Sequence, residues 1–236
     1  LLAGERALAS FGHEEALVFF QRALAAKEGQ LMDGETADLL FGTGRALAVT
    51  LERSRVHEAV DILTRAFEHY VEAGNMFRAV AECPIPSMAG TRSGMMMVEL
   101  LRRALALVEP DSHEAGRLLS LYGRIKGFQE GDYRAAQEAF DQALTIARRE
   151  QDTSLEMRTL AAASYVDWFH LCPDACIERS LGVLKLGEQV DDPSVQVMTY
   201  YGSVYALCEI GNFAEARVHA AACLEAGKRF RDRYWL

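Results

Sequence analysis

The sequence predicts an all-α fold in which about six helix pairs stack into a solenoid. Three observations favour this fold class. A set of small and apolar residues recurs about every 40 residues, capping residues precede several expected helices, and glycines stand where paired helices must turn. Runs of alternating polarity and Asn-Gly hairpin turns are missing from the sequence, so we expect essentially no β-strand.

The recurring set is clearest within residues 130–152, EGDYRAAQEAFDQALTIARREQD. Ala136, Phe140, Ala143 and Leu144 share one helical face, with small residues where a neighbouring helix must come close. Together with this set, similarly spaced sets begin at positions 16, 59, 97, 136, 176 and 216, so the intervals along the chain are 43, 38, 39, 40 and 40 residues. A period this regular indicates a helical repeat whose units pack on their neighbours.

Each repeat is expected to contain a helix, a turn, a second helix and a second turn. The expected units lie near residues 1–32, 33–74, 75–110, 111–151, 152–191 and 192–231, with a seventh starting at 232. Predicted helix starts combine a cap with a first-turn partner: Asp111 with Glu114, Thr153 with Glu156, and Asp192 with Pro193. The glycines of EGDY at 130–133 and IGNF at 210–213 can take the left-handed conformation that ends a helix.

Two places depart from a regular array. In the third unit Pro84 and Pro86 remove amide donors, so we expect the first helix there to kink or stop near Cys83. At the end of the chain Asp232 stands 40 residues after Asp192 and is expected to cap the first helix of a seventh unit. The chain also starts without Met, in what looks like the middle of a helix. We therefore interpret residues 1–236 as a single repeat domain cut from a longer protein, whose apolar end face is prone to self-association.

The run from Gly131 and Tyr133 through Ala136, Phe140 and Ala143 resembles the second half of a tetratricopeptide repeat. GNFAEA at 211–216 is a second match. The resemblance implies a right-handed superhelix of helix pairs. The usual repeat has 34 residues, and the longer type seen here is similar to arrays in large bacterial signalling ATPases and in LuxR-type transcriptional regulators. Looser packing is expected where the sequence departs from the pattern, at Leu171, Ser180 and Ala220.

The composition indicates which kinds of binding partner and which cellular compartment suit the chain. The chain has 25 basic and 34 acidic residues, a formal charge of -9, which repels nucleic acid and anionic membrane. No apolar run approaches the roughly 20 residues of a bilayer span, and the first residues do not read as a secretion signal. Five cysteines do not suggest a disulfide framework. We expect a cytoplasmic protein with reduced thiols.

No catalytic signature is found, so we expect neither an enzyme nor a cofactor. The P-loop, H-E-x-x-H and G-x-S-x-G patterns are missing, and AGTRSG at 89–94 is interpreted as a turn between helices. A zinc site is one interpretation of His170, Cys172 and Cys176, with Cys208 one repeat away. The alternatives are packing thiols, because Cys176 occupies a slot that requires a small buried residue, or a redox-sensitive pair.

Two functions remain: a scaffold that binds a peptide, a partner protein or other domains of the parent chain, and a sensor of a small molecule such as a sugar. By the tetratricopeptide resemblance, the first helix of each pair lines a concave face. The positions carried over are Leu121, Ile125, Phe128, Gln129, Arg158, Ala161, Tyr165, Trp168, Phe169, Met198, Tyr201, Tyr205 and Glu209. We hypothesise that Tyr165, Trp168, Tyr201 and Tyr205 form one partly exposed binding patch. The competing interpretation is that these rings fill space between units.

Overall fold

A computed structural model describes residues 1–29, 31–52, 55–75 and 92–230, with the backbone alone for 92–97. These residues form eleven α-helices and no β-strand, which confirms the all-α class. No helix in this part of the chain has the length and apolar character needed to cross a membrane. The helices are α1 (Leu2–Ala9), α2 (His13–Ala26), α3 (Gly34–Thr50), α4 (Val56–Glu72), α6 (Arg92–Leu105), α7 (His113–Gln129), α8 (Tyr133–Arg149), α9 (Thr153–Phe169), α10 (Pro173–Leu186), α11 (Pro193–Glu209) and α12 (Phe213–Phe230).

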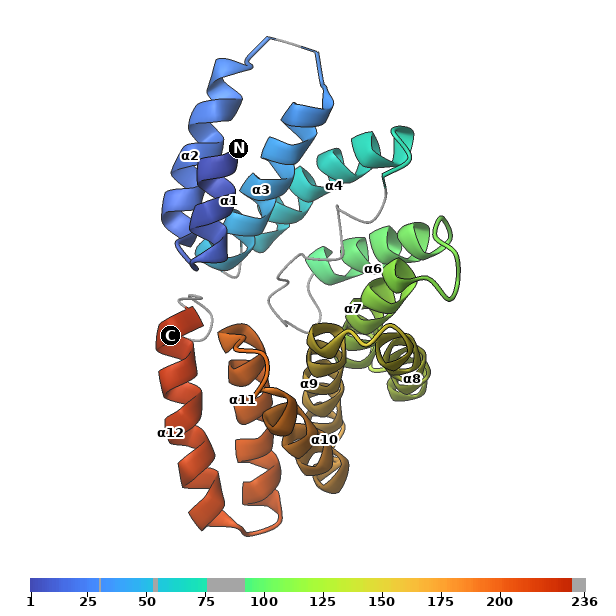
Figure 1. Ribbon diagram of the computed structural model, residues 1–236, viewed down its shortest axis with the longest axis vertical. Helices are drawn as coiled ribbons and strands as arrows, with labels where there is room; N and C mark the ends of the chain where they lie inside the picture. The colour runs from blue at the N-terminus through green and yellow to red at the C-terminus, as the bar shows by residue number, and fades with distance from the viewer. Residues whose placement is uncertain (30, 53–54, 76–91, 231–236) are drawn as a thin grey trace. The chain divides into compact units, whose positions relative to one another are not determined.

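The helices group into two compact units, one containing α1 to α6 and the other α7 to α12. Within each unit, helices joined by short turns pack as pairs, namely α1 with α2, α3 with α4, α7 with α8, α9 with α10, and α11 with α12 (Figure 1). These pairs match five of the expected repeats. The single domain over 1–236 stays a prediction. The predicted stop near Cys83 lies outside the described residues.

The first helix of most pairs begins with a side-chain cap. The capping side chains are Asp33 for α3, Ser112 for α7, Asp152 for α9 and Asp192 for α11, and each accepts a hydrogen bond from a backbone amide of the first turn. The start at Asp192 and Pro193 is confirmed. The other two predicted caps, Asp111 and Thr153, are wrong by one residue, because the neighbouring Ser112 and Asp152 make the capping bonds.

The turns that join the paired helices follow the 40-residue register. Gly131 and Gly211 have left-handed backbone, with φ of 70° and 81°. Leu171 occupies the same place in the intermediate repeat and also has a positive φ, of 57°. A side chain makes this conformation unfavourable, so the turn geometry persists at Leu171 in spite of its residue type.

The recurring set forms the core between helices, as predicted. Ala136, Phe140 and Ala143 of α8 are fully buried. The Phe140 ring packs against the backbone of α7 at Gly123, where an added Cβ would lie 2.8 Å from Cε1. Unit 1 repeats this arrangement at Phe20 of α2, whose ring lies against Gly4 of α1 and Gly42 of α3; a Cβ at Gly42 would come 2.4 Å from Phe20 Cζ. Glycine therefore lets the helices approach each buried ring.

Helix α12 exposes the face that a following helix pair covers elsewhere in unit 2. Leu144 of α8 packs beneath the next pair and is 7% exposed, whereas Leu224, at the corresponding position of α12, is 57% exposed. Ala220 and Val218 of α12 are exposed as well. This apolar outer face agrees with the expectation for the sixth unit. The predicted seventh start at Asp232 lies outside the described residues.

Candidate functional site

Helices α7, α9 and α11 are the first helices of three consecutive pairs, and α9 packs against both of the others. Near their N-terminal ends, His113 Nε2 lies 2.7 Å from Asp152 Oδ2. In the next step of the array, Arg158 Nε donates to Asp192 Oδ2 at 3.3 Å. Burial alone would raise the pKa of Asp152, but hydrogen bonds from the Leu155 amide and His113 hold it below its usual value. Polar bridges thus fix the register of the three helices.

Six aromatic side chains come together toward the C-terminal ends of these helices. We call this cluster the aromatic surface; its members are Phe128 of α7, Tyr165, Trp168 and Phe169 of α9, and Tyr201 and Tyr205 of α11. Ring centroids lie 4.4 Å apart for Phe128 and Phe169, and 5.2 Å apart for Trp168 and Tyr205. Tyr201 lies 5.0 Å from Tyr205 and 5.2 Å from Trp168. The rings therefore form one continuous chain of contacts across three repeats.

The aromatic surface has a buried floor and an exposed rim. Tyr205 and Phe169 are 45% and 39% exposed, and Trp168 and Tyr201 are half-buried. Tyr165 is 1% exposed, so the prediction of a partly exposed Tyr165 is wrong: its ring lies among those of Phe128, Trp168 and Tyr201. The floor fills space between repeats, as the competing interpretation expects, while the rim faces solvent. Binding at the rim stays a prediction.

The other predicted groove positions divide in the same way. Ile125 and Ala161 are buried and belong to the core, and Phe128, also buried, is part of the floor of the aromatic surface. Leu121, Gln129 and Met198 are half-buried, while Arg158 and Glu209 are exposed. Gln129 carries a buried Oε1 with no hydrogen-bond partner among the described residues. A rotation of about 100° per residue explains why adjacent positions of one helix fall on different sides of this boundary.

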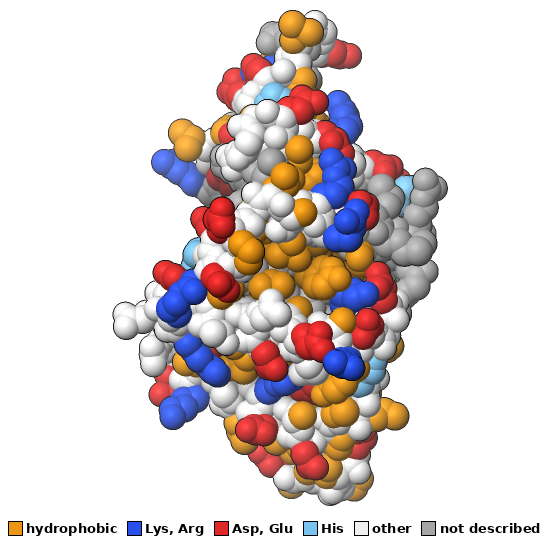
Figure 2. Space-filling model, turned by 90° about the vertical axis from the view of Figure 1, so that its right-hand side faces the viewer, with side chains coloured by type: hydrophobic (Ala, Val, Ile, Leu, Met, Phe, Trp, Pro, Cys, Tyr) orange, Lys and Arg blue, Asp and Glu red, His pale blue; other side chains and the backbone are white. Residues whose placement is uncertain are grey.

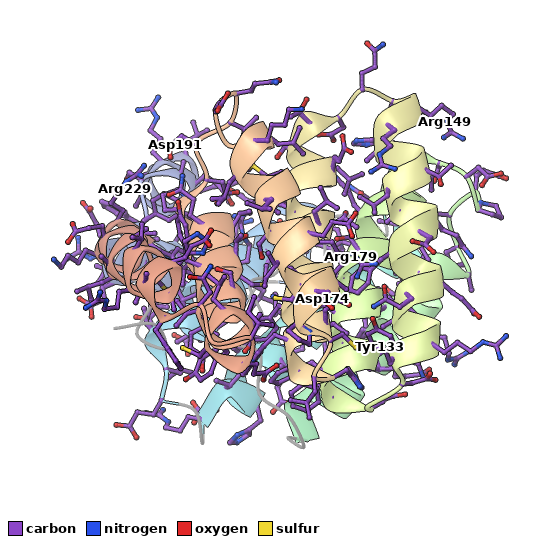
Figure 3. The ribbon with its side chains drawn as sticks, turned by 90° about the horizontal axis from the view of Figure 1, so that it is seen from below. Tyr133, Arg149, Asp174, Arg179, Asp191 and Arg229 are labelled. Atoms are coloured by element: carbon purple, nitrogen blue, oxygen red, sulfur yellow. The ribbon has the colours of Figure 1, made fainter. Side chains whose placement is uncertain are left out.

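A buried carboxylate lies next to the aromatic surface, and sequence reasoning missed it. Asp167 of α9 is fully buried, and its Oδ2 accepts a hydrogen bond from Arg179 Nη1 of α10 at 2.7 Å. Its Oδ1 accepts from Tyr133 Oη of α8 at 2.9 Å and from Gln137 Nε2 at 3.2 Å. Figure 3 shows Tyr133 on α8 and Arg179 on α10, the two helices that flank this carboxylate. The one signal available was an Asp within the mostly apolar second half of this helix, LAAASYVDWF at 160–169.

These four side chains satisfy one another. Arg179 Nη2 also donates to Gln137 Oε1 at 2.6 Å, so the guanidinium binds both neighbouring helices. Burial raises the pKa of Asp167, and the charge of Arg179 opposes that shift. Burial, followed by the hydrogen bond to Asp167, raises the pKa of the Tyr133 hydroxyl as well. Because each polar group has a partner, we assign the cluster a structural role.

The residues of the zinc interpretation do not converge. Across the described residues, no three His, Cys, Asp or Glu side chains could hold a metal ion together. The ring of His170 bonds the carbonyl oxygen of Gly127 through Nε2 at 2.8 Å, and Cys172 Sγ donates to the carbonyl oxygen of His170. Burial raises the pKa of the Cys176 thiol to about 12, which keeps it protonated near neutral pH. Cys176 therefore packs as a small apolar residue would.

A serine and a histidine of the last pair also come together. Ser203 Oγ of α11 lies 2.7 Å from His219 Nδ1 of α12. The hydroxyl is 1% exposed and is also hydrogen-bonded to the carbonyl oxygen of Tyr200, at 3.0 Å. Burial lowers the pKa of His219. A serine nucleophile must be reachable by substrate, so this pair serves to link the two helices.

Comparison with known proteins adds no relative: no family model matches the chain, and no curated protein matches its sequence.

Proposed function

We propose that this chain is a tetratricopeptide-like scaffold that binds a peptide or partner domain on the aromatic surface. The scaffold belongs to a larger cytoplasmic signalling or transcriptional regulator and acts by binding rather than by catalysis. In this proposal the helix pairs form a right-handed superhelix, and α7, α9 and α11 line its concave side. The 40-residue period and the buried recurring set support the repeat type.

The observation that carries the proposal is the exposed aromatic rim. A repeat array can fill its core without aromatic residues at the positions of Trp168, Phe169 and Tyr205. Helix α3, aligned at its cap, has Val49, Thr50 and Ala46 there. Tyrosine and tryptophan supply large contact areas with a polar group, and they are enriched among the residues that dominate binding energy. The rim is continuous across neighbouring helices, as an extended partner requires.

A protein partner fits the electrostatics better than a nucleic acid does. The chain carries a formal charge of -9. On the face shown in Figure 2, basic and acidic side chains are interspersed around exposed hydrophobic ones. Binding to the phosphate backbone relies on clustered Lys and Arg side chains.

The test is a selection from a random-peptide phage library against the wild-type chain, followed by affinity measurements on variants. Peptides that use the aromatic surface should lose affinity by about 30-fold with Tyr205→Ala, equivalent to about 2 kcal/mol. Phe213→Ala is the matched control, because this exposed aromatic residue lies on α12, outside the surface. It should leave affinity unchanged. Melting temperatures establish that both variants fold.

Two outcomes would contradict the scaffold function. One is a selection in which every recovered peptide binds the Tyr205→Ala variant as tightly as the wild type. The other is a chain that selects no peptide but gains thermal stability from small sugars, a gain that Tyr205→Ala leaves unchanged. That result would favour the sensing alternative.

A further inference from the structure

The aromatic surface lies at the C-terminal ends of three helices. Phe128 is in the last turn of α7, Phe169 is the last residue of α9, and Tyr205 lies one turn before Glu209, the last residue of α11. The C-terminal end of a helix carries a partial negative charge from its aligned peptide dipoles, and cations near it are stabilised. The ends of α9 and α11 carry the exposed rings of Phe169 and Tyr205, whereas Phe128 at the end of α7 is buried.

One carboxylate adds to this negative potential on the α11 side. Glu209 follows Tyr205 by four residues on the same helix and is exposed. The sequence of α11, PSVQVMTYYGSVYALCE, contains no Lys or Arg. On α9 the one basic residue is Arg158, near the opposite end and engaged with Asp192. The rim formed by Trp168 and Tyr205 therefore has an acidic border.

The α7 side of the aromatic surface differs from the α11 side, because the basic residues of α7 already interact with other groups of the chain. Lys126 forms ion pairs with Glu130 at 2.5 Å and with Asp132 at 3.7 Å. Arg124 lies one turn before Phe128 and has interactions of its own within the chain. The charge of Asp167, beneath the surface, is paired with Arg179. A cation on a ligand is thus favoured most on the α11 side.

Unit 1 shows that this chain places cations over its own rings. The guanidinium carbon of Arg103 lies 5.0 Å from the centroid of Phe67, and that of Arg45 lies 5.5 Å from the centroid of Phe41. Both distances are within the range for attraction between a cation and an aromatic face. Tryptophan and tyrosine faces attract cations at least as well as phenylalanine does.

We infer that the partner of the aromatic surface is a cationic peptide segment. One of its Arg or Lys side chains packs on the faces of Trp168 and Tyr205, with its charge directed toward Glu209. The inference rests on the proposed function and specifies the chemistry of its partner. The overall charge of -9 favours the approach of such a segment over an acidic one.

The experiment uses the peptides selected above whose binding requires Tyr205. Arg and Lys should outnumber Asp and Glu among them, and replacing the key Arg by its uncharged analogue citrulline should weaken binding. Glu209→Gln should lower affinity about twofold to fivefold, as expected for an exposed charge pair, and Glu209→Lys should lower it further. Glu225→Gln on α12 is the control, since this exposed carboxylate lies off the surface and pairs with Lys228. Affinity should also fall as salt rises.

The two proposals fail in different ways. Peptides that need Tyr205 but show no excess of Arg and Lys, and that bind the Glu209→Lys variant unchanged, would overturn the charge inference and leave the scaffold function intact. If no selected peptide needs Tyr205, both are overturned.

Discussion

Helix α3 of unit 1 and helix α9 of unit 2 each begin a helix pair, but they carry different types of residue at matching positions. Aligning α3 with α9 at their caps, Asp33 and Asp152, places Ala46 opposite Tyr165 and Val49 opposite Trp168. Ala46 and Val49 are buried, whereas Trp168 reaches the surface. Small residues are therefore sufficient for the repeat at these positions. The aromatic side chains of α9 are larger than the fold requires at these positions. This difference in size is the strongest argument for the proposal that they bind a partner.

The units also differ in how their helices are joined. Both units pack a phenylalanine ring against helical glycine, Phe20 in unit 1 and Phe140 in unit 2, but unit 2 adds a buried ionic cluster that links α8, α9 and α10. Substitutions at each kind of junction can test this contrast.

The largest effect is expected from Asp167→Ala in unit 2. Removing the carboxylate leaves the part-buried Arg179 without its ion-pair partner, and breaking a buried pair in this way should cost about 3 kcal/mol of unfolding free energy. Urea denaturation measures the change. Asp167→Ala combined with Arg179→Met should be less destabilised than Asp167→Ala alone; equal or greater loss in the double variant would mean that Arg179 contributes through other contacts.

A smaller loss is expected from Gly42→Ala in unit 1. The new Cβ would come 2.4 Å from the buried Phe20 ring, so overpacking should cost about 2 kcal/mol even after the better helix propensity of alanine. Gly202→Ala of α11 is the matched control. Its Cβ would meet Cys176 Sγ at 3.5 Å, an ordinary contact, so stability should stay equal or rise. Equal losses at the two positions would refute the contrast in packing.

Leu171→Gly should stabilise unit 2 by about 1 kcal/mol. The leucine has a positive φ of 57° and is 73% exposed, so glycine relieves the backbone strain with little loss of packing. Leu181→Gly, at an exposed position within α10, should instead destabilise by about 1 kcal/mol. Thermal unfolding of both variants shows whether each substitution raises or lowers the stability. A loss at Leu171 would indicate that its side chain makes a contact that outweighs the strain.

The smallest effect concerns the exposed face of α12. Val218 and Leu224 should allow weak self-association, with a dissociation constant on the order of 100 μM because one helix face is a small interface. Leu224→Glu should abolish it. Sedimentation velocity over a range of concentrations is the measurement. A wild-type chain that stays monomeric at several hundred micromolar would exclude this contact.

Much of the fold could be predicted because it depends on local periodicity. The spacing of Ala136, Phe140 and Ala143 determines a helical face, and that face is the buried one. Caps were harder to place: Asp152 and Thr153 are both capping residues, and the distance to Glu156 favoured the wrong one. The sequence shows which residue types could cap, but the backbone geometry selects between neighbours.

The site was less predictable for two physical reasons. The aromatic positions came from a repeat register, but one turn of a helix carries both floor and rim, so Tyr165 and Trp168 could not be distinguished. The partners of Asp167 lie 12, 30 and 34 residues away in the chain, on two other helices. No local spacing rule links Arg179, Gln137 and Tyr133 to one carboxylate.

The ionic cluster around Asp167 should also determine which helices unfold locally together. In a repeat array, hydrogen exchange can proceed by fraying one pair at a time from the ends. Here the guanidinium of Arg179 joins α8 and α10 to the last turn of α9, so none of these helices can detach without exposing a buried charge. Amides of α8, α9 and α10 should therefore exchange together, more slowly than those of α12. Trp168, next to Asp167 in sequence, should therefore stay in place when α12 opens.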